Sequence, residues 1–137
     1  MKNKKVILAL NHTWGIVMTL IGYVTRLVML CMGVKGENLG IARLYRVGNG
    51  WGGVSLGTTI IIAKDETSDY TKAHELGHTI QNAMFGILMP FIVQIPSAIR
   101  YHYYNYLRRN GIAPKRSYYA IWFEAQASWL GVKYLGY

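Results

Sequence analysis

Two histidines and a glutamate lie together at residues 74–78, which read His-Glu-Leu-Gly-His. On a helix, His74 and His78 are one turn apart and project from the same face. Both imidazoles can therefore reach one Zn²⁺, whose bonds to histidine nitrogen are about 2.0–2.1 Å long. Glu75 emerges beside such a metal rather than on it, where its carboxylate can take a proton from a metal-bound water. The spacing predicts two zinc ligands and a general base, with Zn²⁺ as the cofactor.

The residues around this motif predict the helix that it needs. Ser68 and Asp69 supply side-chain oxygens that suit an N-cap, and Gly86 suits the C-terminal end. We therefore expect a helix over about residues 70–85.

Upstream of that helix the sequence favours strands. Residues 54–63 are rich in β-branched side chains and predict one strand, and residues 43–47 predict a shorter one. The glycine-rich stretch at 48–53 between them predicts a tight turn. It has no G-x-G-x-x-G pattern opening a helix, which argues against a phosphate-binding loop. Strands followed by helices indicate an α+β fold.

A catalytic zinc normally has three protein ligands and an open position for water. The extended metzincin pattern fails here, because Gln81 and Met84 stand where it has a glycine and its third histidine. Downstream of the motif the chain offers one acidic residue, Glu124, and one histidine, His102. A lone carboxylate among aromatic residues and alanines is costly to bury unless it is paired or binds a metal. We favour Glu124 as the third ligand; the alternatives are His102 as the ligand, or an ion pair of Glu124 with Arg100 or another local base.

The motif at 74–78, followed by Glu124 on a later helix, resembles the gluzincin class of zinc metallopeptidases. The resemblance implies a minimal zincin-like unit in which His74, His78 and Glu124 bind Zn²⁺ and Glu75 is catalytic. It also implies a peptide or protein substrate that pairs with a strand through backbone hydrogen bonds. The residues expected to align the substrate are Leu56, Gly57, Thr58, Thr59 and Ile60. The order of strand, H-E-x-x-H, apolar block and Trp-Phe-Glu also resembles a group of small bacterial membrane-associated proteins.

The chain departs from the gluzincin pattern four residues after Glu124. Many gluzincins have an aspartate there that orients the first histidine, whereas this chain has Ser128, which can hydrogen-bond but adds no charge. No residue is singled out as the oxyanion donor, and the candidates are His102, Tyr101, Tyr103, Tyr104, Tyr118 and Tyr119. These departures keep a second hypothesis open: a catalytically inactive zinc-binding membrane protein that acts as an interaction module.

The N-terminal part of the chain is apolar from Val6 to about Met32, after three lysines. Residues 6–25 carry no formal charge and are long enough for one membrane crossing. We therefore expect a membrane-anchor helix within residues 1–35 and a metal-binding domain over 36–137. A cleaved signal peptide and a buried core helix are the alternatives.

A second apolar block, residues 84–99, contains two prolines, so a regular spanning helix is not expected there. It can be buried, or it can lie in a membrane interface. The basic, tyrosine-rich stretch that follows suits lipid headgroups or single-stranded nucleic acid. Its position beside the apolar block favours lipid.

The overall charge agrees with a lipid partner. Fifteen lysines and arginines against six acidic residues give a net charge of +9, and the single cysteine excludes an intrachain disulfide. We expect the protein at a bacterial cytoplasmic membrane with its catalytic unit facing the cytoplasm, and nucleic acid is the less favoured partner. No pattern indicates the oligomeric state.

Overall fold

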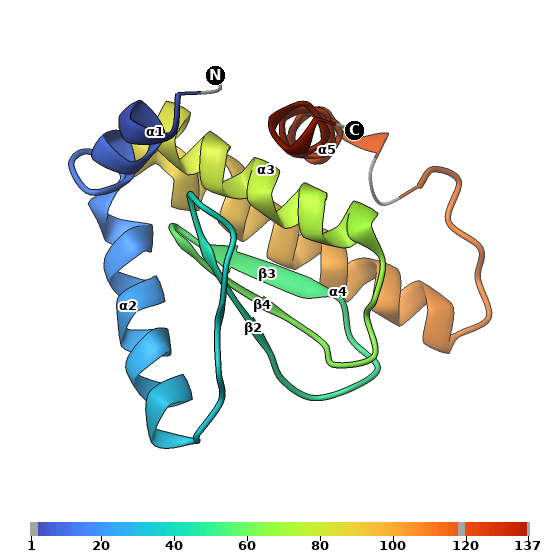
Figure 1. Cartoon of the computed structure of the whole chain (residues 1–137). Coiled ribbons are helices and arrows are strands. Elements are labelled where there is room, and N and C mark those ends of the chain that lie inside the picture. Colours follow the sequence, from blue (N-terminus) through green and yellow to red (C-terminus); the bar gives the residue numbers. More distant parts are fainter. Residues whose placement is uncertain (1–2, 118–119, 137) are drawn as a thin grey trace.

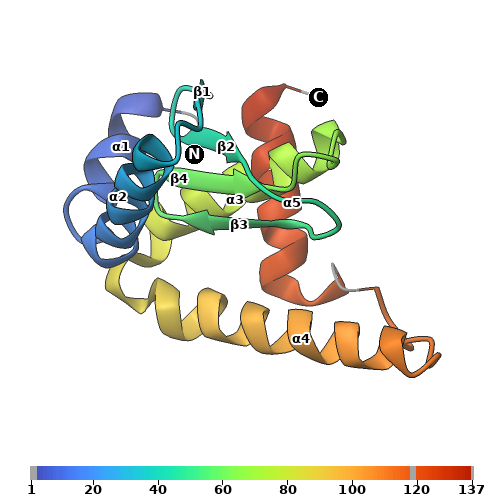
Figure 2. The same cartoon turned by 90° about the horizontal axis from the view of Figure 1, so that it is seen from below.

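A computed structural model describes residues 3–117 and 120–136 of the chain and shows an α+β fold (Figure 1). Within these residues, the helices pack on one face of a four-stranded mixed sheet whose other face is not covered by a helix (Figure 2). In chain order the elements are α1 (Lys4–Asn11), α2 (Ile16–Cys31), β1 (Glu37–Asn38), β2 (Arg43–Arg46), β3 (Gly53–Leu56), β4 (Thr59–Ile62), α3 (Asp69–Phe85), the short helical turns η1 (Gly86–Leu88) and η2 (Pro90–Gln94), α4 (Ile95–Arg109) and α5 (Trp122–Leu135). The predicted α+β class is confirmed.

The sheet has the strand order β1-β2-β4-β3, in which β2 and β4 are parallel and the other neighbours antiparallel. The single strand expected over 54–63 is therefore two strands, β3 and β4. A two-residue turn joins them, and Gly57 in that turn has a φ of 64°, a backbone conformation that glycine adopts without steric cost.

This split corrects the expected substrate-aligning strand. Thr59 and Ile60 belong to β4, which is hydrogen-bonded on both sides, to β2 and to β3. Gly57 and Thr58 form the turn, and Leu56 alone of the five residues lies in β3, which is one edge of the sheet, with β1 at the other. The edge strand that can accept a further strand is thus β3.

The helix of the H-E-x-x-H motif, α3, begins and ends where its sequence indicates. The Ser68 side chain accepts a hydrogen bond from the backbone N–H of Tyr70, and Gly86 is the C-cap. One buried cluster joins α3 to the sheet and to α5, with Ile60, Leu76, Ile80 and Leu130 among its members. Figure 1 shows α3 lying between the sheet and α5.

Helices α3 and α5 touch through their backbones. A Cβ added at Gly77 in α3 would overlap the carbonyl of Ala127 in α5, and one added at Gly131 in α5 would overlap the carbonyl of Ala73 in α3. Small residues four apart on each helix thus allow a close approach. This approach brings Glu124 of α5 next to the histidines of α3.

The N-terminal apolar run is two helices rather than one. None of the described helices is by itself long and apolar enough to cross a membrane. Two bent pairs of helices have the length and composition for a crossing. One pair is α1 and α2, with a bend of 90°; the other joins α3 and η1 to η2 and α4, with a bend of 114°. A regular N-terminal spanning helix is therefore not what the structure shows. The bend lies at residues 12–15, where the backbone packs against α3: Asn82 donates hydrogen bonds to the side chain of Asn11 and to the carbonyl of Gly15.

The N-terminal helices share their core with the rest of the chain. Ile7 of α1 is fully buried in the same cluster as Leu44, Ile60 and Leu76. Arg26 of α2 donates hydrogen bonds to the hydroxyl of Thr59 and to the carbonyl of Thr58. The boundary expected near residue 35 therefore does not separate two cores.

Candidate metal centre

Glu124, His74 and His78 come together in the interior, as the sequence predicts. The Nε2 of His74 lies 2.9 Å from Oε2 of Glu124, and the Nε2 of His78 lies 3.5 Å from the same oxygen. The two histidine Nε2 atoms are 3.2 Å apart. All three side chains are buried, and they form a group that can hold a metal ion.

The spacing of these three atoms suits a tetrahedral ion. Ligand atoms bonded to zinc at about 2.0–2.1 Å in tetrahedral geometry lie about 3.3–3.4 Å from one another. The observed separations of 2.9, 3.2 and 3.5 Å lie close to that value. A tetrahedral ion held by these three ligand atoms would have one position left for water or substrate.

His78 is oriented by a residue that the sequence analysis did not assign. Its Nδ1 lies 2.8 Å from Oε1 of Gln81, whose amide nitrogen donates to the carbonyl of Phe123 and to the side chain of Gln126. Because the Gln81 oxygen can only accept, Nδ1 of His78 carries the proton and Nε2 presents a lone pair. The signal in the sequence is the position of Gln81, one helical turn after His78.

His74 is oriented from α5. Its Nδ1 lies 2.8 Å from the hydroxyl of Ser128, which in turn lies 2.7 Å from the hydroxyl of Tyr70. Ser128 therefore occupies the orienting role for which the sequence made it a candidate, through a neutral hydroxyl. Tyr70, one turn before His74 on α3, extends this chain of hydrogen bonds and was not predicted.

These contacts test whether a cation fits the site. With both Nδ1 atoms engaged by Gln81 and Ser128, the two Nε2 atoms point at one carboxylate oxygen of Glu124 and at each other. Two imidazole nitrogens and a carboxylate oxygen that converge in a buried space require a proton or a metal ion between them. Imidazole nitrogen and carboxylate oxygen are both ligands of Zn²⁺, so the residues fit that ion.

The pKa values of Glu124 and His78 are both shifted by the contacts between them. Burial raises the pKa of the Glu124 carboxyl, but the hydrogen bonds from His74 and His78 outweigh it and hold that pKa well below its ordinary value. Burial lowers the pKa of His78, but its hydrogen bond to Glu124 and the nearby Glu75 charge raise it above its ordinary value overall. Both shifts have the same cause, the attraction between a protonated imidazole and the Glu124 carboxylate.

Glu75 lies beside the group without bonding to it. It is buried, and its Oε2 has no hydrogen-bond partner among the described residues. Burial raises its pKa, a shift that His78 and His74 oppose. A Cβ added at Gly53 would lie 3.3 Å from Cγ of Glu75, so this glutamate sits directly under the edge strand β3.

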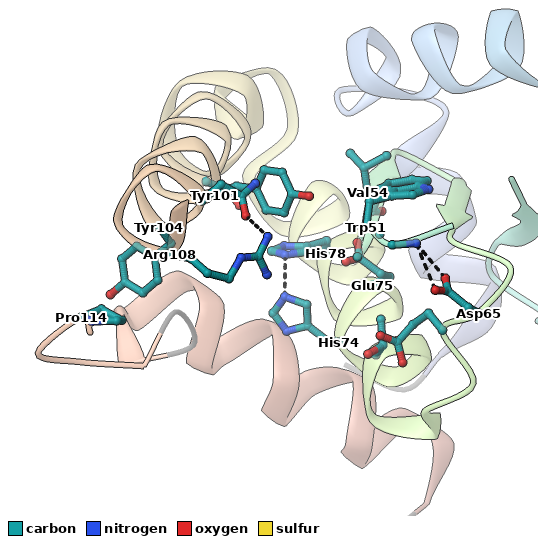
Figure 3. Close-up of a pocket in the computed structure, with 18 of the residues that line it drawn as sticks. Trp51, Val54, Asp65, His74, Glu75, His78, Tyr101, Tyr104, Arg108 and Pro114 are labelled. Carbon is teal, nitrogen blue, oxygen red and sulfur yellow. Dashed lines mark hydrogen bonds between the residues drawn. The ribbon is translucent and has the colours of Figure 1, made fainter. Parts of the chain in front are cut away.

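A cavity of about 850 Å³ opens onto this group (Figure 3). One wall is the edge strand β3 with the loop before it, and the other is α4, which runs beside β3 in Figure 2. Ser97, Tyr101, Tyr104 and Arg108 line it from α4. The floor holds His74, Glu75 and His78, so a substrate lying between β3 and α4 reaches the metal group.

One end of the cavity is marked by a bond between its two walls. The side-chain amide of Gln94, in the π-helical turn before α4, donates to the carbonyl of Ser55 in β3 at 2.6 Å. Neighbouring residues of an antiparallel edge strand alternate between bonding inward and outward. Gly53 therefore presents its backbone groups outward as Ser55 does, and Gln94 already occupies the Ser55 acceptor.

The candidate oxyanion donors differ in whether they line the cavity and in whether their hydroxyl groups are already hydrogen-bonded. His102 and Tyr103 are exposed on α4 and do not line the cavity. Tyr101 and Tyr104 line it, but the Tyr104 hydroxyl is bonded to the carbonyl of Arg116. The Tyr101 hydroxyl forms no hydrogen bond within the described parts of the chain, and Figure 3 shows its ring in the cavity. Two further candidates, Tyr118 and Tyr119, lie outside the described residues.

Fold and site together define an α+β protein with a buried His-His-Glu group at the floor of an open cleft. Comparisons with protein-family models, curated proteins and solved structures find no match to the chain. What the protein does has therefore to be argued from the site itself.

Proposed function

We propose that the protein is a zinc-dependent metallopeptidase of gluzincin type. The observation that supports this most strongly is the convergence of three buried ligand atoms, from His74, His78 and Glu124, next to the unpartnered carboxylate of Glu75. The group lies at the floor of a cleft large enough for several peptide residues. A purely structural zinc site is usually closed by a fourth protein ligand, and no fourth His, Cys, Asp or Glu joins this group among the described residues.

The substrate in this proposal is an extended peptide that adds a strand to β3. Gly53 directs its backbone N–H and C=O into the cleft and has no side chain to obstruct a second chain. Backbone pairing fixes the register of the peptide, and pockets for alternate side chains provide selectivity. Pairing at Gly53 places a peptide carbonyl above Glu75, because these two residues are in contact.

Each residue then has a role that its position suits. His74, His78 and Glu124 would hold Zn²⁺, which supplies Lewis acidity and a bound water of lowered pKa. Glu75 accepts a proton from the attacking water and passes it to the leaving amine. Tyr101 donates a hydrogen bond to the oxyanion that develops on the peptide carbonyl. Ser128 and Gln81 keep the two imidazoles oriented.

The test combines metal content with peptide cleavage. Wild-type protein, repleted with zinc, is expected to hold one zinc per chain and to cleave members of a peptide library detected by mass spectrometry. Glu124→Ala should lose the zinc, whereas the matched control His102→Ala should keep it because His102 is exposed on α4. Glu75→Gln should retain zinc and lose cleavage by at least about a hundredfold.

Two outcomes would contradict the proposal. Cleavage by Glu75→Gln at the wild-type rate would show that Glu75 is not the general base. Absence of zinc from the wild-type protein would show that zinc is not its cofactor. Zinc binding without turnover on any peptide would favour the alternative, a zinc-stabilised interaction protein, for which the uncharged Ser128 beside His74 is the supporting observation.

A further inference from the structure

One side of the molecule exposes a set of large apolar side chains that the metal site does not use. We name it the α2–η2 face; its members are Trp14, Val17, Leu20, Ile21, Val24, Leu27, Val28, Leu30, Met32, Ile87, Leu88, Phe91, Ile95 and Ile99. Leu27 and Phe91, for example, are 63 % and 69 % exposed. Single exposed apolar residues are ordinary on protein surfaces, whereas a patch of this extent marks an interaction site.

The two parts of this face are connected through Trp14. Its indole ring fills the space beside Gly86 at the start of η1, and its N–H donates to the carbonyl of Ala83 in α3. Just beyond it, Met18 of α2 packs against Met89 and Val93 of the η1–η2 region. Figures 1 and 2 both show α2 and the turn between α3 and α4 at the same end of the molecule, away from α5.

The charge of the same helices is entirely positive. The six acidic residues of the chain are Glu37, Asp65, Glu66, Asp69, Glu75 and Glu124, and none of them lies in α1, α2, η1, η2 or α4. Their basic residues are Lys4 and Lys5 in α1, Arg26 in α2, and Arg100, Arg108 and Arg109 in α4. An apolar face on helices without negative charge complements the surface of a membrane that contains anionic lipid.

The inner side of α2 shows why this contact is interfacial. Gly22 packs against the carbonyl of Leu56, and Arg26 is bonded to Thr58 and Thr59 of the sheet hairpin. A helix held by protein on one side and apolar on the other lies in the plane of a bilayer interface. Its 16 residues also span only about 24 Å, less than the roughly 30 Å hydrocarbon core.

We propose that the α2–η2 face inserts into the headgroup region of an anionic lipid bilayer. The alternative occupant is a second copy of this chain, but a symmetric dimer through this face would bring together two sets of helices that contain basic residues and no acidic residue to pair with them. Lipid phosphates neutralise these charges, whereas a second copy repeats them. The proposal stands on the surface alone and is independent of the peptidase activity.

The single cysteine allows a test that needs no substitution. Cys31 is the last residue of α2 and is exposed, at the edge of the α2–η2 face. Wild-type protein labelled there with an environment-sensitive fluorophore is mixed with vesicles of phosphatidylcholine and phosphatidylglycerol at a 3:1 ratio. A blue shift and intensity rise on these vesicles, weaker on pure phosphatidylcholine and in high salt, is expected.

Substitutions then locate the contact by vesicle flotation. Leu27→Asp and Phe91→Asp should each lower the fraction bound to the 3:1 vesicles by about tenfold, because a charged side chain is costly to insert. Trp129→Asp is the matched control, since Trp129 is 58 % exposed but lies on α5, outside the α2–η2 face. It should bind as the wild type does.

Three results would overturn the proposal. The first is an unchanged Cys31 fluorophore spectrum on anionic vesicles. The second is equal loss of binding in Trp129→Asp and Phe91→Asp. The third is a lipid-free dimer, seen in sedimentation, that Leu27→Asp converts to monomer, which would assign this face to a second copy of the chain.

Discussion

Gly77 of α3 lies against the carbonyl group of Ala127 in α5, closely enough that no side chain fits between the two helices. Ala73 and Gly131 form the reciprocal contact one turn away. These contacts set the distance between the helix that carries His74 and His78 and the helix that carries Glu124. Gly77, the fourth residue of the H-E-x-x-H motif, thus serves the metal site through backbone packing rather than through ligation.

Enlarging that contact should damage the metal site. Gly77→Ala is expected to push α5 away, to lower zinc affinity and to cost about 1–3 kcal/mol of unfolding free energy, as overpacking does. Gly52→Ala is the control, because an added Cβ there meets no atom within 4 Å. Zinc content and thermal unfolding measure both effects; a Gly77→Ala protein that holds zinc like the wild type would refute the packing argument.

Gln81 should control zinc affinity through the orientation of His78. Gln81→Met keeps the volume of the side chain but removes the acceptor for Nδ1–H, so the imidazole can turn or take the other tautomer. Loss of such a supporting contact typically lowers metal affinity by about 10–100-fold. Competition with a chromophoric chelator measures this. Gln94→Met, a glutamine outside the ligand contacts, should leave affinity unchanged.

Zinc uptake should release protons, and fewer of them as the pH rises. The pKa of His78 and that of Glu75 are both raised in the metal-free protein, and a ligating imidazole must be neutral. Calorimetry in buffers of different ionisation enthalpy counts the protons released. A proton count that does not change between pH 6 and pH 9 would contradict the raised pKa of His78.

The raised pKa values of His78 and Glu75 predict that the stability of the metal-free protein falls with rising pH, whereas the stabilisation by zinc grows. A histidine with a raised folded-state pKa stabilises the fold below its ordinary value of 6.5, and this contribution is lost as the pH rises through the folded pKa. The raised pKa of the Glu75 carboxyl likewise makes the folded state less stable as the pH rises above 4.5. The metal-free protein should therefore melt at lower temperature at pH 8 than at pH 6, whereas zinc should stabilise it more at pH 8.

Gln94 should limit the length of substrate that the cleft accepts at one end. Its bond to the Ser55 carbonyl occupies the acceptor that a longer peptide strand would use. Gln94→Ala should therefore extend binding to longer peptides. Fluorescence anisotropy of a labelled peptide ladder on the non-cleaving Glu75→Gln background measures this, with and without Gln94→Ala. Identical length dependence would show that this bond does not close the cleft.

The parts of the site that local sequence determines were predicted, whereas of the parts that depend on distant contacts only the approach of Glu124 was. The caps Ser68 and Gly86 and the face shared by His74 and His78 follow from helix geometry within one stretch of chain. The approach of Glu124 was also predicted, because an isolated carboxylate in an apolar segment needs a partner. That this group can hold a metal ion is confirmed, while zinc as its identity stays a prediction.

The misses have physical reasons. The turn within the β-branched run at 54–63 was missed, because its one sequence signal is Gly57. The residues on either side of it do not indicate that this glycine has a positive φ. The N-terminal apolar run is bent because Asn82 bonds to Asn11 and Gly15, a contact across about seventy positions of sequence. Apolar composition alone does not distinguish a spanning helix from two helices packed on a sheet.

The hydrogen bond between Asn82 and Asn11 also joins the helix of the metal ligands to the N-terminal helices. Asn82 follows His78 by one turn on α3, so the same rigid helix holds the metal ligands and the corner between α1 and α2. For a protein that lies on a bilayer through the α2–η2 face, no flexible stalk separates the lipid surface from the floor of the cleft. The cleft then stays at a constant height and tilt above the lipid, and only peptide segments that present themselves at that height come within reach of Glu75.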